Sequence, residues 1–259
     1  MKIIANPSLN FGNRKPSSKI NSIVLHYTGM VSFEAAINRM KNPDYEVSAH
    51  YCIDFNGDIH QLVDEKRKAW HAGNSHWRGM ESLNDTSIGI EIANRGHEFG
   101  YEHFPDEQIF AVISLCKDII KRNHDIDARN IVGHSDIAPD RKEDPGELFP
   151  WKELAESNIG IFHSINYDKE FQYREPMTTD GEESKAIGEI QRKLSVIGYK
   201  IQKSTIFDEQ TKKVVAAFYR RFLPERIFMS ENTRQPEYIQ WDGLSDIILN
   251  DIFQKFSSY

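Results

Sequence analysis

Hydrophobic and polar positions along the first 160 residues follow strand and helix periods in turn. Residues 20–27 are rich in β-branched and apolar side chains, which predicts a short buried strand with His26 near its end. Residues 130–133 form a second short apolar run, which predicts a strand that delivers His134. Both histidines therefore lie at the ends of predicted strands.

Residues 87–94 alternate between apolar and polar positions with a period of two. This alternation places the isoleucines on one face of a predicted strand and Glu91 on the other, so the carboxylate faces away from the apolar side. Residues 50–55 and 59–63 flank Asn56-Gly57, a strong signal for two antiparallel strands. We expect a type I′ turn there, in which both central residues take a positive φ.

Two amphipathic helices are predicted in the same part of the chain. Ser32 caps a helix that continues to about Met40. Pro105 opens a second helix, whose apolar face is formed by Ile109, Val112, Cys116, Ile119 and Ile120. The mixture of strands and helices predicts an α/β domain.

A polar stretch at residues 166–181 separates this domain from a helical region. Gly198 closes a helix whose apolar face is formed by Ile187, Ile190, Leu194 and Ile197. Asp208 caps a second helix, and a third amphipathic helix follows near the end of the chain. We therefore predict two domains, residues 1–164 and a small three-helix domain at residues 165–259.

Composition and charge exclude several classes of protein. The net charge of −7 lies mainly in the first domain and argues against a duplex nucleic-acid partner, which a basic face normally binds. The longest apolar run, Val214 to Tyr219, is far shorter than the roughly 18 residues of a membrane helix. The two cysteines, Cys52 and Cys116, are too far apart in sequence for a zinc knuckle or a disulfide framework. Any metal must therefore be held by histidine and carboxylate.

Two histidines and one carboxylate form a candidate zinc site. Asp144 follows His134 by ten residues and begins a rigid Asp-Pro-Gly turn, and His26 ends an earlier strand. Three protein ligands leave a fourth tetrahedral position for water, which is typical of a catalytic zinc site. Hydrolysis of an amide also needs a base and a cation near the oxyanion, and Glu91 and Lys142 fit these two roles.

These residues lie in stretches that resemble the zinc-dependent N-acetylmuramoyl-L-alanine amidases of the AmpD and AmiD type, which are related in fold to phage T7 lysozyme and the peptidoglycan recognition proteins. The matching stretches run in family order over roughly residues 6–160 and are Ile23–Thr28, Val47–Tyr51, Ala69–Gly73, Asn84–Glu91 and Gly133–Gly146. The resemblance implies a central mixed β-sheet flanked by helices. It also implies one Zn²⁺ per catalytic domain.

The resemblance also assigns roles residue by residue. It makes His26, His134 and Asp144 the zinc ligands, Glu91 the general base and Lys142 the group that stabilises the transition state. The family hydrolyses the amide between the lactyl group of N-acetylmuramic acid and L-alanine of the stem peptide. Peptidoglycan and muropeptides are therefore the expected partners.

Three further assignments concern binding. Trp70 and His71 fall where the family lines its substrate groove, and His50 is better explained as a buried, hydrogen-bonded strand residue than as a ligand. The C-terminal helices resemble small peptidoglycan-binding modules through Ile190-Gln191, Leu194, Ile197-Gly198-Tyr199, Ile206-Phe207-Asp208, Thr211 and Phe218. A structural appendage that binds no ligand is the alternative for this domain.

Two other functions and two compartments stay open. A recognition module would bind muropeptides without cutting them, although it would not need the water-activating residues. A zinc peptidase that cuts within the stem peptide is the other, but the sequence has no His-Glu-x-x-His motif. The second domain and residues 6–11 favour the cell envelope or periplasm, whereas the lack of a visible signal peptide points to the cytoplasm. We expect a chain ending near Ile161 to retain activity on soluble muropeptides and to bind insoluble wall less well.

Overall fold

A computed structural model describes residues 2–167, 176–229 and 239–258. Of the polar stretch predicted to be a linker, residues 168–175 lie outside the described residues. Within the described ranges, no helix combines the length and the apolar character needed to cross a membrane.

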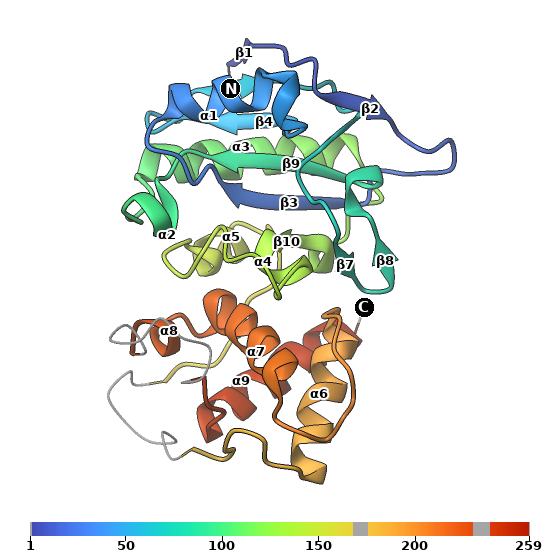
Figure 1. Cartoon of the computed structure of the whole chain (residues 1–259), viewed down its shortest axis with the longest axis vertical. Coiled ribbons are helices and arrows are strands. Elements are labelled where there is room, and N and C mark those ends of the chain that lie inside the picture. The colour runs from blue at the N-terminus through green and yellow to red at the C-terminus, as the bar shows by residue number, and fades with distance from the viewer. Residues whose placement is uncertain (1, 168–175, 230–238, 259) are drawn as a thin grey trace.

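A six-stranded mixed sheet forms the centre of the N-terminal part, as Figure 1 shows. In spatial order its strands are β1 (Ile3–Ala5), β5 (Ile59–Gln61), β4 (Tyr51–Ile53), β9 (Ser87–Ile92), β3 (Ser22–Tyr27) and β10 (Ile131–Gly133). Strands β4, β9, β3 and β10 are parallel, whereas β5 runs antiparallel to β4 and parallel to β1. The prediction of a central mixed sheet is confirmed.

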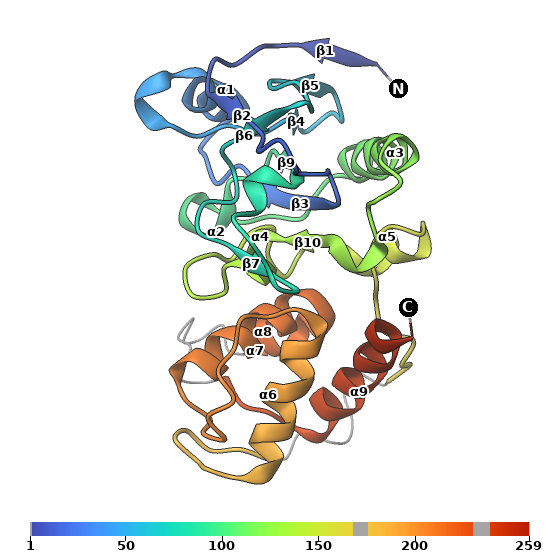
Figure 2. The same ribbon diagram turned by 90° about the vertical axis from the view of Figure 1, so that its right-hand side faces the viewer.

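Helices cover both faces of this sheet (Figure 2). Helices α3 (Asp106–Arg122) and α5 (Trp151–Glu156) lie on one face, and α1 (Phe33–Lys41) and α2 (Gly96–Phe99) lie on the other. The three isoleucines of β9 are buried in one apolar cluster with residues of α3. Since side chains alternate along a strand, Glu91 faces away from α3, as the period of two predicted.

Shorter elements connect this framework. Two small antiparallel sheets pair β2 (Phe11–Asn13) with β6 (Arg67–Ala69), and β7 (His76–Trp77) with β8 (Met80–Glu81). The helix α4 (His134–Ile137) and three 3₁₀ turns complete this part of the fold, at Pro43–Tyr45, Leu83–Asp85 and Ala128–Asn130. The predicted cap is present at α1, where the Ser32 hydroxyl accepts the N–H of Ala35, and α3 begins directly after Pro105, as predicted.

The hairpin of β4 and β5 is antiparallel as predicted, but the predicted type I′ turn is wrong. Gly57 has a φ of +81°, whereas Asn56 is not in the positive-φ region. The Asp54 carboxylate accepts the backbone N–H groups of Asn56 and Asp58, and the Gly57 N–H donates to the Asp54 carbonyl. These contacts of the Asp54 side chain stabilise a longer connection that needs only one positive φ.

The C-terminal part is helical, and its three predicted helices are present. They are α6 (Lys185–Ile197), α7 (Glu209–Phe222) and α9 (Gly243–Ser257), and the short α8 (Glu225–Met229) was not predicted. Side-chain oxygens of Ser184, Asp208 and Asp242 cap the three longer helices. Gly198 ends α6 with a φ of +145°, a backbone conformation that favours glycine.

One apolar cluster joins the two parts of the chain. Trp77 on β7 is fully buried, and its ring centroid lies 5.1 Å from that of Tyr199 and 6.5 Å from that of Phe256. The same cluster includes Ile137 of α4 and residues of α6, α7 and α9. Both views place α7 directly beside α4 and β10 (Figures 1 and 2). The two predicted domains are therefore packed on a common core.

Candidate metal centre

Parallel strands bring the candidate residues to one edge of the sheet. His26 on β3 pairs in register with Glu91 on β9. Strand β10 lies parallel to β3 on its other side and ends directly before His134. Because the carboxyl ends of parallel strands meet at the same edge, the three side chains gather there.

His26, His134 and Asp144 converge in this region. The two Nδ1 atoms lie 3.0 Å apart, and Asp144 Oδ2 lies 2.9 Å from Nδ1 of His26 and 3.1 Å from Nδ1 of His134. All three side chains are buried. The structure thus brings together the set that the sequence predicted, and its role as a set of metal ligands stays a prediction.

Hydrogen bonds hold the ring of His26 in the form that suits metal binding. The Ser87 hydroxyl donates to the Leu83 carbonyl at 2.6 Å, so its oxygen accepts the Nε2–H of His71 at 3.1 Å. Nδ1 of His71 then accepts the Nε2–H of His26 at 3.0 Å. The lone pair of His26 therefore lies on Nδ1, the atom that faces the other two candidate ligands.

The donor set fits a metal ion. Two imidazole nitrogens and one carboxylate oxygen have all their candidate ligand atoms within 4.8 Å of one another. Tetrahedral zinc with bonds of about 2.0–2.1 Å places neighbouring ligand atoms a little over about 3 Å apart, which is close to the spacing here. The residues His26, His134 and Asp144 could therefore hold a metal ion.

Electrostatics favours the charge states that a metal needs. Burial lowers the pKa of His26 to about 4, and the neighbouring His134 contributes to that shift. Burial raises the pKa of Asp144, but the charges and hydrogen bonds of His134 and His26 outweigh this effect and hold it well below its ordinary value. At neutral pH the site therefore offers a neutral His26 imidazole and an ionised carboxylate, the forms in which these groups bind metal.

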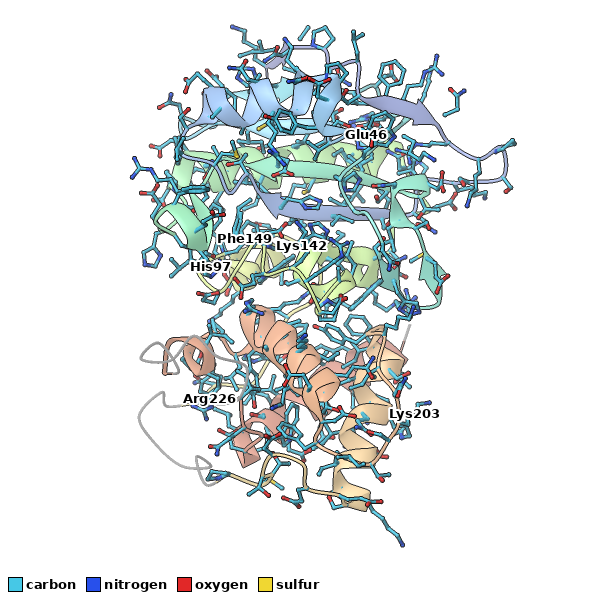
Figure 3. All side chains as sticks on the ribbon, viewed as in Figure 1. Glu46, His97, Lys142, Phe149, Lys203 and Arg226 are labelled. Carbon is cyan, nitrogen blue, oxygen red and sulfur yellow. The ribbon has the colours of Figure 1, made fainter. Side chains whose placement is uncertain are left out.

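Glu91 and Lys142 line the same cavity as the three candidate ligands, and its volume is about 650 Å³. Oε2 of Glu91 is buried and has no hydrogen-bond partner among the described residues. Burial and the Asp144 carboxylate raise the pKa of Glu91 well above its ordinary value, while Lys142 acts in the opposite direction. A carboxyl group with a raised pKa is suited to take up and return a proton near neutral pH. Figure 3 shows Lys142 near α4, on the side of the sheet that faces the helical part.

The two predicted substrate contacts occupy different environments. His71 lines the cavity, but it is buried and both of its ring nitrogens contact His26 and Ser87. This arrangement gives His71 a positioning role. Trp70 is half-buried beside Gly12 and is not among the residues that line the cavity. Substrate contact by Trp70 or His71 stays a prediction.

His50 is buried and hydrogen-bonded, as the sequence predicted, but it lies directly before β4 and not within the strand. Its Nδ1 accepts the N–H of Gly89 at 3.0 Å, and burial together with the Arg14 guanidinium lowers its pKa to about 3. Cys52 and Cys116 are free, buried thiols whose pKa values are raised by burial. Such thiols are poor nucleophiles.

The family described as N-acetylmuramoyl-L-alanine amidase, Amidase_2, matches residues 16–147, about half of the chain. The chain belongs to this amidase family. The matched region contains every strand of the central sheet except β1, and all five residues of the candidate site.

Two relatives within the family are similar in sequence. AmiD, an N-acetylmuramoyl-L-alanine amidase of Escherichia coli, is 46% identical over 156 residues, which cover 56% of this chain and 55% of AmiD. AmpD, a 1,6-anhydro-N-acetylmuramyl-L-alanine amidase of Haemophilus influenzae, is 34% identical over 167 residues. That match covers 58% of this chain and 89% of AmpD. The chain thus spans little more than half of AmiD but most of AmpD.

Two solved structures of the family resemble nearly the whole chain. AmiD from E. coli, in complex with the substrate anhydro-N-acetylmuramic acid-L-Ala-D-γ-Glu-L-Lys, has a TM-score of 0.71 and 32% identity over 95% of this chain and 94% of its own. AmpDh3 from Pseudomonas aeruginosa, in complex with anhydromuramic pentapeptide, has a TM-score of 0.71 and 33% identity over 94% and 95%. These amidases therefore share the arrangement of the sheet and most of the C-terminal part as well.

Proposed function

We propose that this protein is a zinc-dependent N-acetylmuramoyl-L-alanine amidase. It hydrolyses the amide between the lactyl group of N-acetylmuramic acid and L-alanine of the stem peptide, in peptidoglycan or in anhydromuropeptides. The observation that carries the proposal is the convergence of His26, His134 and Asp144 in a cavity that Glu91 and Lys142 also line. The muropeptides bound in the AmiD and AmpDh3 structures support this choice of substrate.

The side chains of the site divide the chemistry among them. His26, His134 and Asp144 would hold zinc, which when bound supplies a Lewis acid for the carbonyl group and makes water more acidic. Glu91 takes a proton from the attacking water and returns it to the departing nitrogen of L-alanine. Lys142 stabilises the negative charge that develops on the carbonyl oxygen. The oxygen of water ends in the lactyl carboxylate, and the stem peptide leaves with a free amine.

Mass spectrometry of a purified 1,6-anhydromuropeptide tests this proposal. The zinc-loaded protein should release the intact stem peptide, a chelator should stop the release, and added zinc should restore it. A Glu91→Gln protein prepared in the same way controls for contaminating amidases. An uncut substrate in the presence of zinc would favour the recognition module, and cleavage inside the peptide would favour the stem-peptide peptidase.

We also propose that the enzyme acts in the cell envelope, where polymeric wall is available. The likeness of its C-terminal helices to wall-binding modules supports this location. Fractionation of the natural host, with detection of the protein by an antibody, tests it. Recovery of the protein with cytoplasmic markers would instead point to the recycling of soluble fragments.

A further inference from the structure

One helix of the C-terminal part contacts residues that lie close in sequence to two of the candidate metal ligands. Helix α7 carries Arg220 and Arg221 in succession, and Figures 1 and 2 show this helix beside α4 and β10. Arg221 contacts Asp136, which lies two residues after His134. Arg220 contacts Glu143, the residue directly before the third candidate ligand. Two neighbouring arginines thus contact two of the three segments that supply the candidate ligands, those of His134 and Asp144.

Asp136 connects the local turn with the distant helix. Its carboxylate is fully buried, and Oδ2 accepts the N–H of Gly133 at 2.8 Å, which fixes the turn from β10 into α4. The same oxygen accepts a hydrogen bond from Nη1 of Arg221 at 2.7 Å, and Oδ1 accepts the hydroxyl of Tyr199 at 2.8 Å. A buried carboxylate needs such partners. Both side-chain partners come from the C-terminal part.

Arg221 joins three elements of the N-terminal part. Its Nη2 donates to the Ile131 carbonyl on β10 at 3.0 Å, while Nη1 binds Asp136 near the start of α4. Its guanidinium carbon lies 4.4 Å from the centroid of the Trp151 ring on α5. A lysine cannot reproduce this combination, because it lacks the planar fork.

Arg220 contacts the segment that contains Asp144, the third candidate ligand. Its Nη2 donates to Oε1 of Glu143 at 2.7 Å, and its Nε lies 3.8 Å from Oε2 of Glu147. These two glutamates flank Asp144 in sequence. The carbonyl of Asp144 in turn accepts the N–H of Ser135 at 2.9 Å, which links this segment to the first one. Movement of either segment would therefore change the distance between the candidate ligands.

We propose that the C-terminal helical part positions the candidate metal ligands through Arg220, Arg221 and Tyr199, whether or not it also binds cell wall. This inference rests on the proposed function, because the positioned groups are the ligands assigned there. It also changes our expectation for a chain that ends near Ile161. Such a chain lacks all three residues and exposes Trp77, so it should lose metal affinity and turnover even on soluble muropeptides.

Single substitutions in the full-length protein test the proposal. Tyr199→Phe removes one hydrogen bond to Asp136, Arg220→Ala removes the contact with Glu143, and Arg221→Lys keeps the charge but loses the fork. The matched control is Arg192→Ala on α6, a partly exposed residue that, among the residues the structure describes, pairs only with Glu189 and lies over Phe253. Zinc affinity is measured by competition with a chromophoric chelator, kcat and KM on a soluble anhydromuropeptide, and stability by thermal unfolding.

We expect Tyr199→Phe and Arg220→Ala to weaken zinc binding by about tenfold, the lower end of what removal of an outer hydrogen-bond partner costs a metal site. Their kcat should fall while KM changes little, and Arg192→Ala should match the wild type. A purely stabilising role would lower the unfolding temperature but leave the zinc affinity of the folded protein unchanged. That result would overturn the proposal.

The two remaining outcomes are also decisive. If Arg221→Lys does not fold, Tyr199→Phe and Arg220→Ala still decide the matter, because each removes contacts at only one segment. If the wild type binds zinc but cuts no muropeptide, the proposed function fails. The chelator competition then still measures positioning, since it needs no substrate.

Discussion

Replacement of Trp77 by alanine tests whether the two parts of the chain share one core. The indole is fully buried, packs edge to face against Tyr199 and donates its N–H to the Arg129 carbonyl at 2.8 Å. Truncation of a buried tryptophan to alanine costs about 3–5 kcal/mol in cores of this kind. The lost hydrogen bond adds about 1 kcal/mol, so we expect the free energy of unfolding to fall by about 4–6 kcal/mol.

This loss of stability should be shared by the N-terminal and C-terminal parts of the chain. Because Trp77 belongs to the N-terminal part, whereas Tyr199 follows the end of α6 and Phe256 lies on α9, both parts should lose stability together. Hydrogen exchange of peptides from β3 and from α9, combined with urea unfolding, measures this directly. Phe110→Ala on the exposed side of α3 is the control and should change stability by less than about 0.5 kcal/mol. Lost protection in α9 alone, or two separate unfolding transitions, would refute a shared core.

Three further predictions concern the site and its surroundings. Glu91→Gln and Lys142→Ala should bind zinc as the wild type does and lose at least about 100-fold in kcat, because neither is assigned as a ligand; metal content and turnover of the same samples check this, and loss of zinc would refute the assigned roles. Asp144→Ala should instead lose zinc in a chelator competition, and unchanged affinity would remove Asp144 from the ligand set. His50 has a pKa of about 3 in the folded protein, below its ordinary value of 6.5, so the unfolded chain takes up the proton first as the pH falls. This proton uptake at His50 should lower the free energy of unfolding by about 2 kcal/mol as the pH falls from about 7.5 to about 5. In denaturant titrations over this pH range, the free energy of unfolding of His50→Gln should fall less than that of the wild type by this amount, and an equal fall in both proteins would contradict the prediction.

The strands and the site residues could be predicted largely because their signals are local. The alternation around Glu91 and the apolar run before His134 depend only on neighbouring residues. The resemblance of residues 133–146 to the amidase family then placed Asp144 and Lys142 in the same site. The prediction of a type I′ turn at Asn56 was wrong because it considered only the two central residues. The side chain of Asp54, two residues earlier, accepts the N–H groups that set the geometry of the turn.

The positioning contacts could not be predicted, because they join residues far apart in sequence. The bond between Ser87 and His71 fixes the lone pair of His26, yet nothing in the local pattern marks Ser87 as more than a strand residue. The two consecutive arginines of α7 look in sequence like an ordinary basic end of a helix. Only the packing of α7 against α4 shows that Arg221 is buried against Asp136. Long-range contacts of this type leave no periodic signal.

Hydrolysis of an anhydromuropeptide in water enriched in ¹⁸O tests the central claim most directly. The account predicts that one ¹⁸O atom enters the lactyl carboxylate of the sugar product, while the released stem peptide carries a free L-alanine amine and no label. Label in a carboxylate of a peptide fragment would show that a bond within the stem is cut. That result would contradict the assignment of this protein as an N-acetylmuramoyl-L-alanine amidase.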